Sequence, residues 1–311
     1  MVHTAEGAAR RFIARDVRAV GAALDPSGLR MVRLDVADES DGAMPLGPDE
    51  HPSPVSPGSF AEWAARLGTP AALPNIYLPS EARLSRPDGD DMFTGPELDE
   101  HARRYLTAAT DARALRVRGR VLQWIALRSA VDVAGTLRWA SLSCGPAFPV
   151  VAAIAGARDV GATVAATFVD TCTDALDASR RVALAHGVDP GDHRFVSIED
   201  QPASPAAVVE PASQHLVEAL ALLSTVTPDE TPAALADAYA LVRPGGTLVF
   251  SVMLDDRPPC AGCAALGWPT GPTLDLAGVA DLLAAAGIPC EDALALVPQD
   301  GIYAVVQVER P

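Results

Sequence analysis

The segment SLSCGPA, residues 141–147, joins an apolar strand-like run to a helix-like run and could form a cofactor-binding turn. Gly145 would let the backbone approach a ligand closely, because glycine has no Cβ. The next apolar run ends in Asp170, about 25 residues after Gly145. A carboxylate at such a position can hold both hydroxyls of a ribose. Together these features predict a nucleotide-type cofactor site, and an ordinary strand–helix corner is the alternative.

Further acids follow later strand-like runs. The run HRFVSIED ends in Glu199 and Asp200, which are well placed for the exocyclic amine of an adenine. Glu218 lies between Val217 and Ala219, so its carboxylate either has a partner or faces the cleft. His215 is a candidate base, but it begins a strand and so lies away from the carboxyl edge of the sheet.

Polar residues before residue 125 are weaker candidates. His101 and Tyr105 are one helical turn apart and could face a substrate pocket, although a solvated helix face is the alternative. Arg113, Arg116 and Arg120 could bind the cofactor carboxylate or an acidic substrate, or could pair with surface acids.

Strand and helix patterns alternate after residue 135, which predicts a doubly wound α/β sheet. Apolar β-rich runs occupy 138–142, 162–169, 193–198, 214–222, 246–254, 290–297 and 302–308. Helical stretches occupy 148–157, 172–186, 231–242 and 275–286. The last two strands flank a short turn, so we expect a hairpin and an antiparallel last strand in a mostly parallel sheet of seven strands.

The first part of the chain reads as an α-helical extension. We expect helices over residues 5–24, over SFAEWAARLG at 59–68, and over one or two segments of 96–130. A Pro/Gly/acid-rich loop covers 40–58. This organisation predicts a helical cap that shapes the substrate region over residues 1–125, and an α/β cofactor-binding domain over 126–311.

Composition excludes several classes of protein. Hydrophobic residues make up 49% of the 311 residues, and the formal net charge is −16. That charge argues against nucleic acid binding through bulk electrostatics. No apolar run approaches the length of a membrane span, and the N-terminal segment has no signal-peptide pattern, so we expect a cytoplasmic protein without membrane association.

The five cysteines are an odd number scattered along the chain, which favours reduced thiols over a disulfide framework. Cys260 and Cys263 form a lone CxxC, and a structural zinc site needs four ligands. We therefore expect no metal. A homodimer is the default expectation for an enzyme of this size.

This order of motifs resembles the class I S-adenosylmethionine (SAM)-dependent methyltransferases. The resemblance rests on SLSCGPA, on FVDTCTDALDASRRVALAHGV and on ALADAYALVRPGGTLVFSVM, and it covers roughly residues 115–308. The spelling SLxCGPA is most like that of bacterial small-molecule enzymes. The resemblance implies SAM as cofactor and a last strand inserted antiparallel between the fifth and sixth.

The resemblance also implies a set of cofactor contacts. They fall on Ser141, Ser143, Cys144, Gly145, Asp170, Thr171, Glu199, Asp200 and Arg113. Three positions depart from the family pattern: Ser141 replaces its usual acid, and Ser143 and Ala147 replace two of its motif glycines. The lost acid puts the contact to the cofactor's amino group in doubt.

The sequence therefore predicts a SAM-dependent methyltransferase that acts on a small molecule, and bacterial specialised metabolism is the setting we expect. No catalytic residue is assigned, and His101, Tyr105 and Glu218 are the candidates. A non-catalytic protein of the same fold is one alternative, and a SAM-binding enzyme that promotes a rearrangement is another. A nicotinamide oxidoreductase is disfavoured because the chain lacks G-x-G-x-x-G.

Overall fold

Two compact units make up the chain. The computed structural model describes residues 17–37, 59–67, 69–70, 72–79, 97–199, 205–257 and 272–311. The first unit comprises Met1–Val36, Arg118–Arg257 and Gly271–Pro311, and the second comprises Ala37–Val117 and Pro258–Thr270. Each unit is described by itself below.

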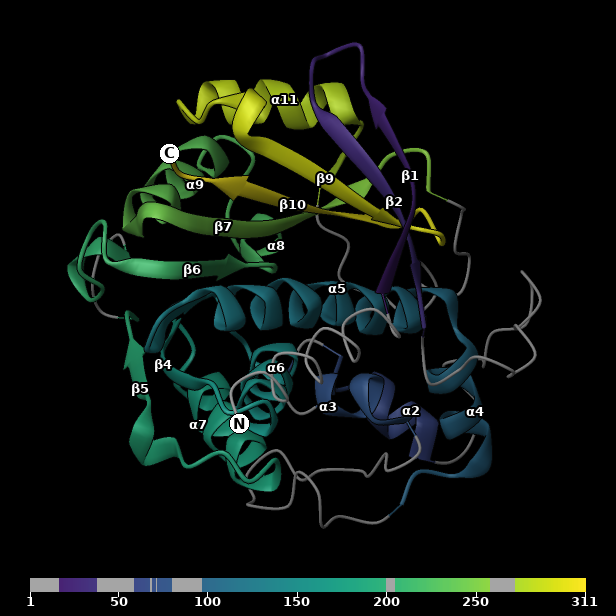
Figure 1. The fold of residues 1–311 in the computed structure, drawn as a ribbon. Helices are drawn as coiled ribbons and strands as arrows, with labels where there is room; N and C mark the ends of the chain where they lie inside the picture. The colour runs from purple at the N-terminus through teal and green to yellow at the C-terminus, as the bar shows by residue number, and fades with distance from the viewer. Residues whose placement is uncertain are drawn as a thin grey trace. The chain divides into compact units, whose positions relative to one another are not determined.

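A single mixed sheet forms the first unit (Figure 1). Its strands are β1 (Val17–Leu24), β2 (Arg30–Val36), β3 (Thr136–Leu142), β4 (Thr163–Asp170), β5 (Arg194–Ser197), β6 (Gln214–Ala219), β7 (Val242–Leu254), β8 (Thr273–Leu274), β9 (Ala293–Pro298) and β10 (Tyr303–Glu309). The strand order is β1-β2-β9-β10-β7-β6-β3-β4-β5, and β8 pairs with β7.

Strand order reverses at β3, where the chain continues to β4 and β5 on one side and returns to β6 and β7 on the other. These five strands are parallel, so their carboxyl ends lie on one edge of the sheet. Ligands of open α/β sheets bind outside the carboxyl ends at such a reversal. β10 lies antiparallel between β7 and β9, as Figure 1 shows.

Helices cover the sheet and form the second unit. They are α2 (Ser59–Ala64), α3 (Leu73–Tyr77), α4 (Glu100–Ala108), α5 (Thr110–Asp132), α6 (Phe148–Asp159), α7 (Thr173–Ala185), α8 (Leu222–Thr225), α9 (Thr231–Leu241) and α11 (Leu276–Ala285). α6 and α7 pack on β4, whereas α9 packs on β6 and β7 with α11 beside it. The buried core includes Val217, Leu248 and Phe250, because parallel strands covered on both faces are apolar throughout.

The prediction of seven strands is wrong in number but right in position. All seven predicted runs are strands, and the antiparallel insertion of the last strand is confirmed. The sheet gains β1, β2 and β8, for a total of ten strands in the described part of the chain. The extension is therefore not purely helical, since β2 pairs in parallel with β9.

The helix predicted over residues 5–24 is wrong for its described part, since residues 17–24 form β1. All of β1 after Val17 is exposed, on both faces of the strand. Its backbone pairing with β2, rather than burial, therefore holds this strand in place. A strand without a buried face shows no alternation of apolar and polar residues, and so its sequence carried no strand signal.

In the second unit, a buried arginine ties three segments together. The Arg116 guanidinium donates hydrogen bonds to the carbonyl oxygens of Ile76 (2.9 Å), Leu106 (2.8 Å) and Thr107 (2.7 Å). Only 5% of Arg116 is exposed. This arginine is therefore a structural residue, and the expectation that it could bind a cofactor or substrate is wrong.

The two glycines before the apolar part of β7 have different roles. Gly245 has a φ of +73°, and a Cβ there would meet no atom within 4 Å. A Cβ on Gly246 would lie 2.8 Å from the Gln214 carbonyl oxygen and 3.0 Å from that of Arg243. The pairing of β6 and β7 shifts register between Gln214 and Leu216. Close backbone approach at this shift requires glycine at 246.

We predict that Gly246→Ala destabilises the protein more than Gly245→Ala. The methyl group at 246 forces two backbone carbonyls apart, which costs about 2–3 kcal/mol of unfolding free energy. The methyl group at 245 contacts no atom, so Gly245→Ala costs only the strain of alanine in a left-handed backbone conformation, about 1 kcal/mol. Urea unfolding followed by circular dichroism measures both values. An equal loss in the two variants would contradict the assignment.

Candidate functional site

The loop between β3 and α6 has an unusual backbone. Ser143, Gly145 and Ala147 have φ values of 50°, 54° and 51°. Only one other non-glycine residue of the described chain, Ala212, has a positive φ. Left-handed serine and alanine are strained, and such strain concentrates at functional sites. The chain therefore forms this turn with serine and alanine at two of its three left-handed positions.

Asp170 links this loop to the end of β4. Its Oδ2 accepts a hydrogen bond from the Gly145 N–H at 2.8 Å, and its Oδ1 accepts one from the Cys172 N–H at 2.9 Å. Asp170 is half-buried. Each carboxylate oxygen keeps a further acceptor position, so Asp170 can still receive two hydroxyl donors.

α7 holds the same loop from beside β4. The Ser179 hydroxyl lies 2.7 Å from the Gly145 carbonyl oxygen and 3.0 Å from that of Ala175. Burial raises the pKa of the Cys144 thiol well above its usual range, and the nearby carboxylate of Asp170 raises it further. This environment favours the neutral thiol over the thiolate that a nucleophile needs.

A second carboxylate lies on the strand next to Ser141. Ser141 and Glu218 are register partners on β3 and β6. The Ser141 hydroxyl donates to Glu218 Oε2 at 2.5 Å, and the Leu220 N–H donates to Oε1 at 2.7 Å. Ser141 is fully buried and Glu218 is 4% exposed. β6 thus places a carboxylate beside the position where β3 lacks one.

The environment of Glu218 opposes its ionisation. Burial raises the pKa of its carboxyl above the ordinary value of 4.5, whereas the hydrogen bonds from Ser141 and Leu220 and the charge of Arg118 lower it. A buried carboxylate with a raised pKa at the carboxyl edge of a sheet is typical of a functional site.

Sequence reasoning missed Arg118. Its Nη1 donates to the Ser251 hydroxyl at 3.2 Å and lies 3.4 Å from the Leu220 carbonyl oxygen. Its guanidinium lies 4.9 Å from the centroid of the Tyr303 ring. No sequence signal separates Arg118 from Arg116, because the rotation of α5 about its axis decides which arginine reaches the sheet.

The remaining predicted residues make no hydrogen bond to Asp170 within the described part of the chain. Thr171 and Glu199 are exposed and follow β4 and β5, at the same edge as Asp170. Asp200 lies outside the described residues, as do Cys260 and Cys263.

Three candidates belong to the second unit. His101 and Tyr105 lie on α4, where His101 is exposed and Tyr105 is buried, and Arg113 lies on the first part of α5. Their roles stay predictions.

His215 lies at the amino end of β6, as expected. Its Nδ1 accepts a hydrogen bond from the Arg138 N–H at 3.1 Å.

The described residues offer neither a metal site nor a membrane-spanning helix. No group of three or more His, Cys, Asp or Glu residues there could hold a metal ion. None of the described helices is long and apolar enough to cross a membrane.

Solved structures resemble this chain in fold. A possible exported protein from Bordetella parapertussis has a TM-score of 0.52 and 18% identity over 81% of this chain and 79% of its own. The CMeT domain of the citrinin polyketide synthase has a TM-score of 0.50 and 15% identity, over 81% and 66% respectively. The SAM-dependent methyltransferase SibL has a TM-score of 0.48 and 22% identity, over 81% and 69%.

No protein-family model and no curated protein matches the sequence. The structural likeness shows a methyltransferase-like α/β fold with a mixed sheet. At these identities it shows the fold alone.

We predict a pH-dependent stability difference for Glu218→Gln. Because the folded state raises the pKa of Glu218, its stabilising effect is present below about pH 4.5 and is lost as the pH rises through the raised pKa. Glutamine cannot ionise, so the variant should gain stability relative to the wild type as the pH rises above about 4.5. Urea unfolding at several pH values measures this difference.

Glu291→Gln, which changes an exposed carboxyl group, is the matched control and should show no such trend. A difference for Glu218→Gln that stays constant with pH, or that grows in favour of the wild type, would contradict the effect of burial.

Proposed function

We propose that this protein is a SAM-dependent methyltransferase that transfers a methyl group to a small-molecule acceptor. The observation that carries the proposal is the hydrogen bond between Asp170 and the Gly145 N–H, made where the strand order reverses at β3. This contact places a carboxylate and a glycine turn together at the edge where open α/β sheets bind nucleotides.

The described residues fit the nucleoside end of SAM. Asp170 retains acceptor positions for the two ribose hydroxyls, and its existing bonds to Gly145 and Cys172 hold it in place. Glu199 follows β5 at the same edge, and its carboxylate would accept a hydrogen bond from the exocyclic amine of the adenine. Thr171, between Asp170 and Cys172, would contact the nucleoside from the loop.

The amino-acid end of SAM needs groups of opposite charge. Glu218 would pair with the ammonium group of SAM. Ser141 would orient the Glu218 carboxylate through the hydrogen bond from its hydroxyl. An ammonium partner also offsets the cost of burying the Glu218 charge. Arg118, at the ends of β6 and β7, would attract the carboxylate group.

Bound SAM would supply an electrophilic methyl group on its sulfonium. The chain's own residues would align it: Asp170 and Gly145 fix one end, and Glu218 fixes the other. Such alignment converts an encounter of two molecules into a displacement within one complex. The net charge of −16 favours a small molecule over a nucleic acid as acceptor.

We predict that Asp170→Asn weakens binding of S-adenosylhomocysteine by tenfold or more, about 1.4 kcal/mol, and that it weakens adenosine binding similarly. Both ligands contain the ribose that Asp170 would hold. Calorimetric titration of dialysed protein measures both affinities. Asp281→Asn changes an exposed acid on α11 and should leave both affinities unchanged.

A folded wild type that binds neither ligand would overturn the cofactor assignment. Unchanged binding by a well-folded Asp170→Asn variant would overturn the role of Asp170 only.

We predict that Glu218→Gln weakens S-adenosylhomocysteine binding roughly thirtyfold, about 2 kcal/mol, but leaves adenosine binding unchanged. Adenosine lacks the ammonium group, so it tests whether the nucleoside end stays intact. Ser141→Ala and Arg118→Met should show the same selectivity with smaller losses. Equal losses for both ligands would mean that Glu218 supports the fold of the site and does not pair with the cofactor.

A non-catalytic protein that binds SAM is the second candidate. The strained Ser143 and Ala147 favour it, because they restrict a turn that glycine usually forms. Binding of S-adenosylhomocysteine without methyl transfer to any member of a broad acceptor panel would support this candidate. Turnover of SAM with any acceptor would exclude it.

A further inference from the structure

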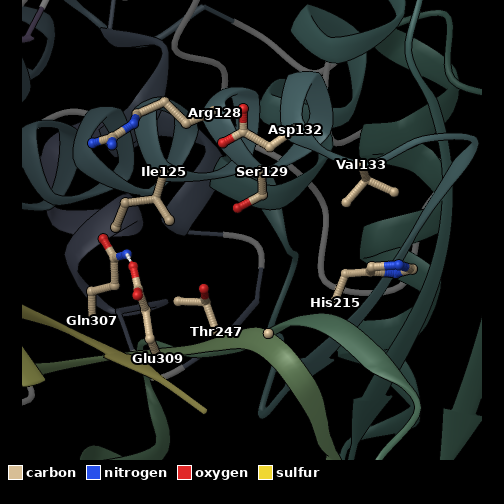
Figure 2. Close-up of a pocket in the computed structure, with 10 residues that line it drawn as sticks. Ile125, Arg128, Ser129, Asp132, Val133, His215, Thr247, Gln307 and Glu309 are labelled. Atoms are coloured by element: carbon tan, nitrogen blue, oxygen red, sulfur yellow. Dashed lines mark hydrogen bonds between the residues drawn. The ribbon is translucent and has the colours of Figure 1, made fainter. Parts of the chain in front are cut away.

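Two features of the first unit lie away from the proposed cofactor site. One is a pocket of about 250 Å³ between α5 and the sheet (Figure 2). Its acids, Asp132 and Glu309, are exposed and share the lining with the exposed Arg128, so the pocket selects no particular charge of ligand. The other feature is strand β1, which forms one end of the sheet within the described part of the chain.

β1 is an edge strand with an apolar surface. β2 pairs with one side of β1, and no described strand pairs with its other side. Three large hydrophobic side chains are exposed in the described part of the chain, and two of them, Val20 at 58% and Leu24 at 69%, lie on β1. An exposed apolar edge is a template for pairing with another chain, and many proteins protect it with lysine or proline. β1 contains neither residue.

The pairing with β2 gathers apolar side chains on one face of β1. The register shifts after Ala19, so that Ala19 is opposite Leu34 and Ala22 is opposite Val32. Leu34 and Val32 are two residues apart and therefore lie on the same face of the sheet. Leu24, two residues after Ala22, lies on this face as well. Such a face favours contact with a second apolar strand.

The charges at the two ends of β1 differ in sign. Arg18 is the only charged residue of the strand; its guanidinium pairs with Asp35 at 2.6 Å and is largely exposed, so it keeps further donors. Asp25 follows the other end. Its Oδ1 accepts hydrogen bonds from the Ser27 hydroxyl (2.6 Å) and the Ser27 N–H (2.9 Å), which lower the pKa of Asp25 and favour its charged form. The segment between Arg18 and Asp25, AVGAAL, is uncharged.

We propose that a second copy of this chain pairs with β1, strand to strand and antiparallel, about a two-fold axis. Antiparallel pairing brings the Arg18 end of each strand beside the Asp25 end of the other, and opposite charges across strands are stabilising. Parallel pairing would bring like charges together. The same patch then faces itself, as a two-fold interface requires. This inference does not depend on the proposed methyltransferase function.

Sedimentation velocity of the full chain tests the proposal. Two short strands bury less surface than the roughly 1,200–2,000 Å² of a stable interface, so we expect a dissociation constant of about 10 µM. Concentrations from about 1 to about 200 µM bracket this value and should show a shift from monomer to dimer. A monomer at every concentration would overturn the proposal and would leave β1 to a partner of another kind.

Lysine substitutions locate the interface. Val20→Lys and Leu24→Lys each bring two like charges together across the two-fold axis and should weaken the dimer by about tenfold. Both positions are exposed, so the melting temperature of the dilute variants should stay that of the wild type. Leu184→Lys makes the same change at the third exposed hydrophobic residue, on α7, and should not alter dimerisation. Equal effects of Val20→Lys and Leu184→Lys, or none of either, would overturn the proposal.

Asp25→Asn tests the charge pairing. Asparagine keeps an oxygen that can accept the hydrogen bonds from Ser27 but removes the charge, so the variant should weaken the dimer about threefold. Asp281→Asn makes the same change on α11 and should leave the dissociation constant unchanged. An unchanged constant for Asp25→Asn would overturn the charge pairing that selects the antiparallel arrangement.

Discussion

The hydrogen bond from the Gly145 N–H to Asp170 ties the loop after β3 to the end of β4, and the proposed cofactor site depends on it. The N–H can reach the carboxylate only because the loop turns through left-handed residues at 143, 145 and 147. Ser179 on α7 bonds to the Gly145 carbonyl, which fixes the other side of the same residue. The loop is therefore held in place without a ligand, which would reduce the ordering cost of binding one.

A buried carboxylate is costly unless hydrogen bonds or an opposite charge stabilise it. The parallel register of β3 and β6 sets the Ser141 hydroxyl directly beside Glu218. At this level of the sheet the carboxylate therefore comes from β6 and not from β3. Two hydrogen bonds and the charge of Arg118 offset part of the cost of burying the Glu218 carboxylate. The pKa of Glu218 nevertheless remains raised, so a cationic ligand would stabilise its charged form further.

Most of the sheet and its helices could be predicted because they are buried. Parallel strands covered on both faces leave long apolar runs, and polar or glycine-rich segments such as Pro244-Gly245-Gly246 in the first part of β7 interrupt them. β1 could not be predicted, since an exposed strand has no buried face to mark its period. Asp170 could be recognised from its position after a strand. The pairing of Ser141 with Glu218 could not, because it depends on which strands are neighbours and on their register.

α5 relates the two polar regions of the sheet face that it crosses. Arg118, Ile125 and Asp132 recur at spacings that keep one face of the helix on the sheet. About fourteen residues separate Arg118 from Asp132, which spans roughly 20 Å of helix. Arg118 lies at the carboxyl edge with Ser251, and Asp132 lies at the amino edge with Thr247. On β7, Thr247 precedes Ser251. Residues of α5 between them, such as Leu122, are fully buried. Because closely packed side chains resist small displacements, a ligand at one of these edges would affect the other only by shifting this buried part of α5.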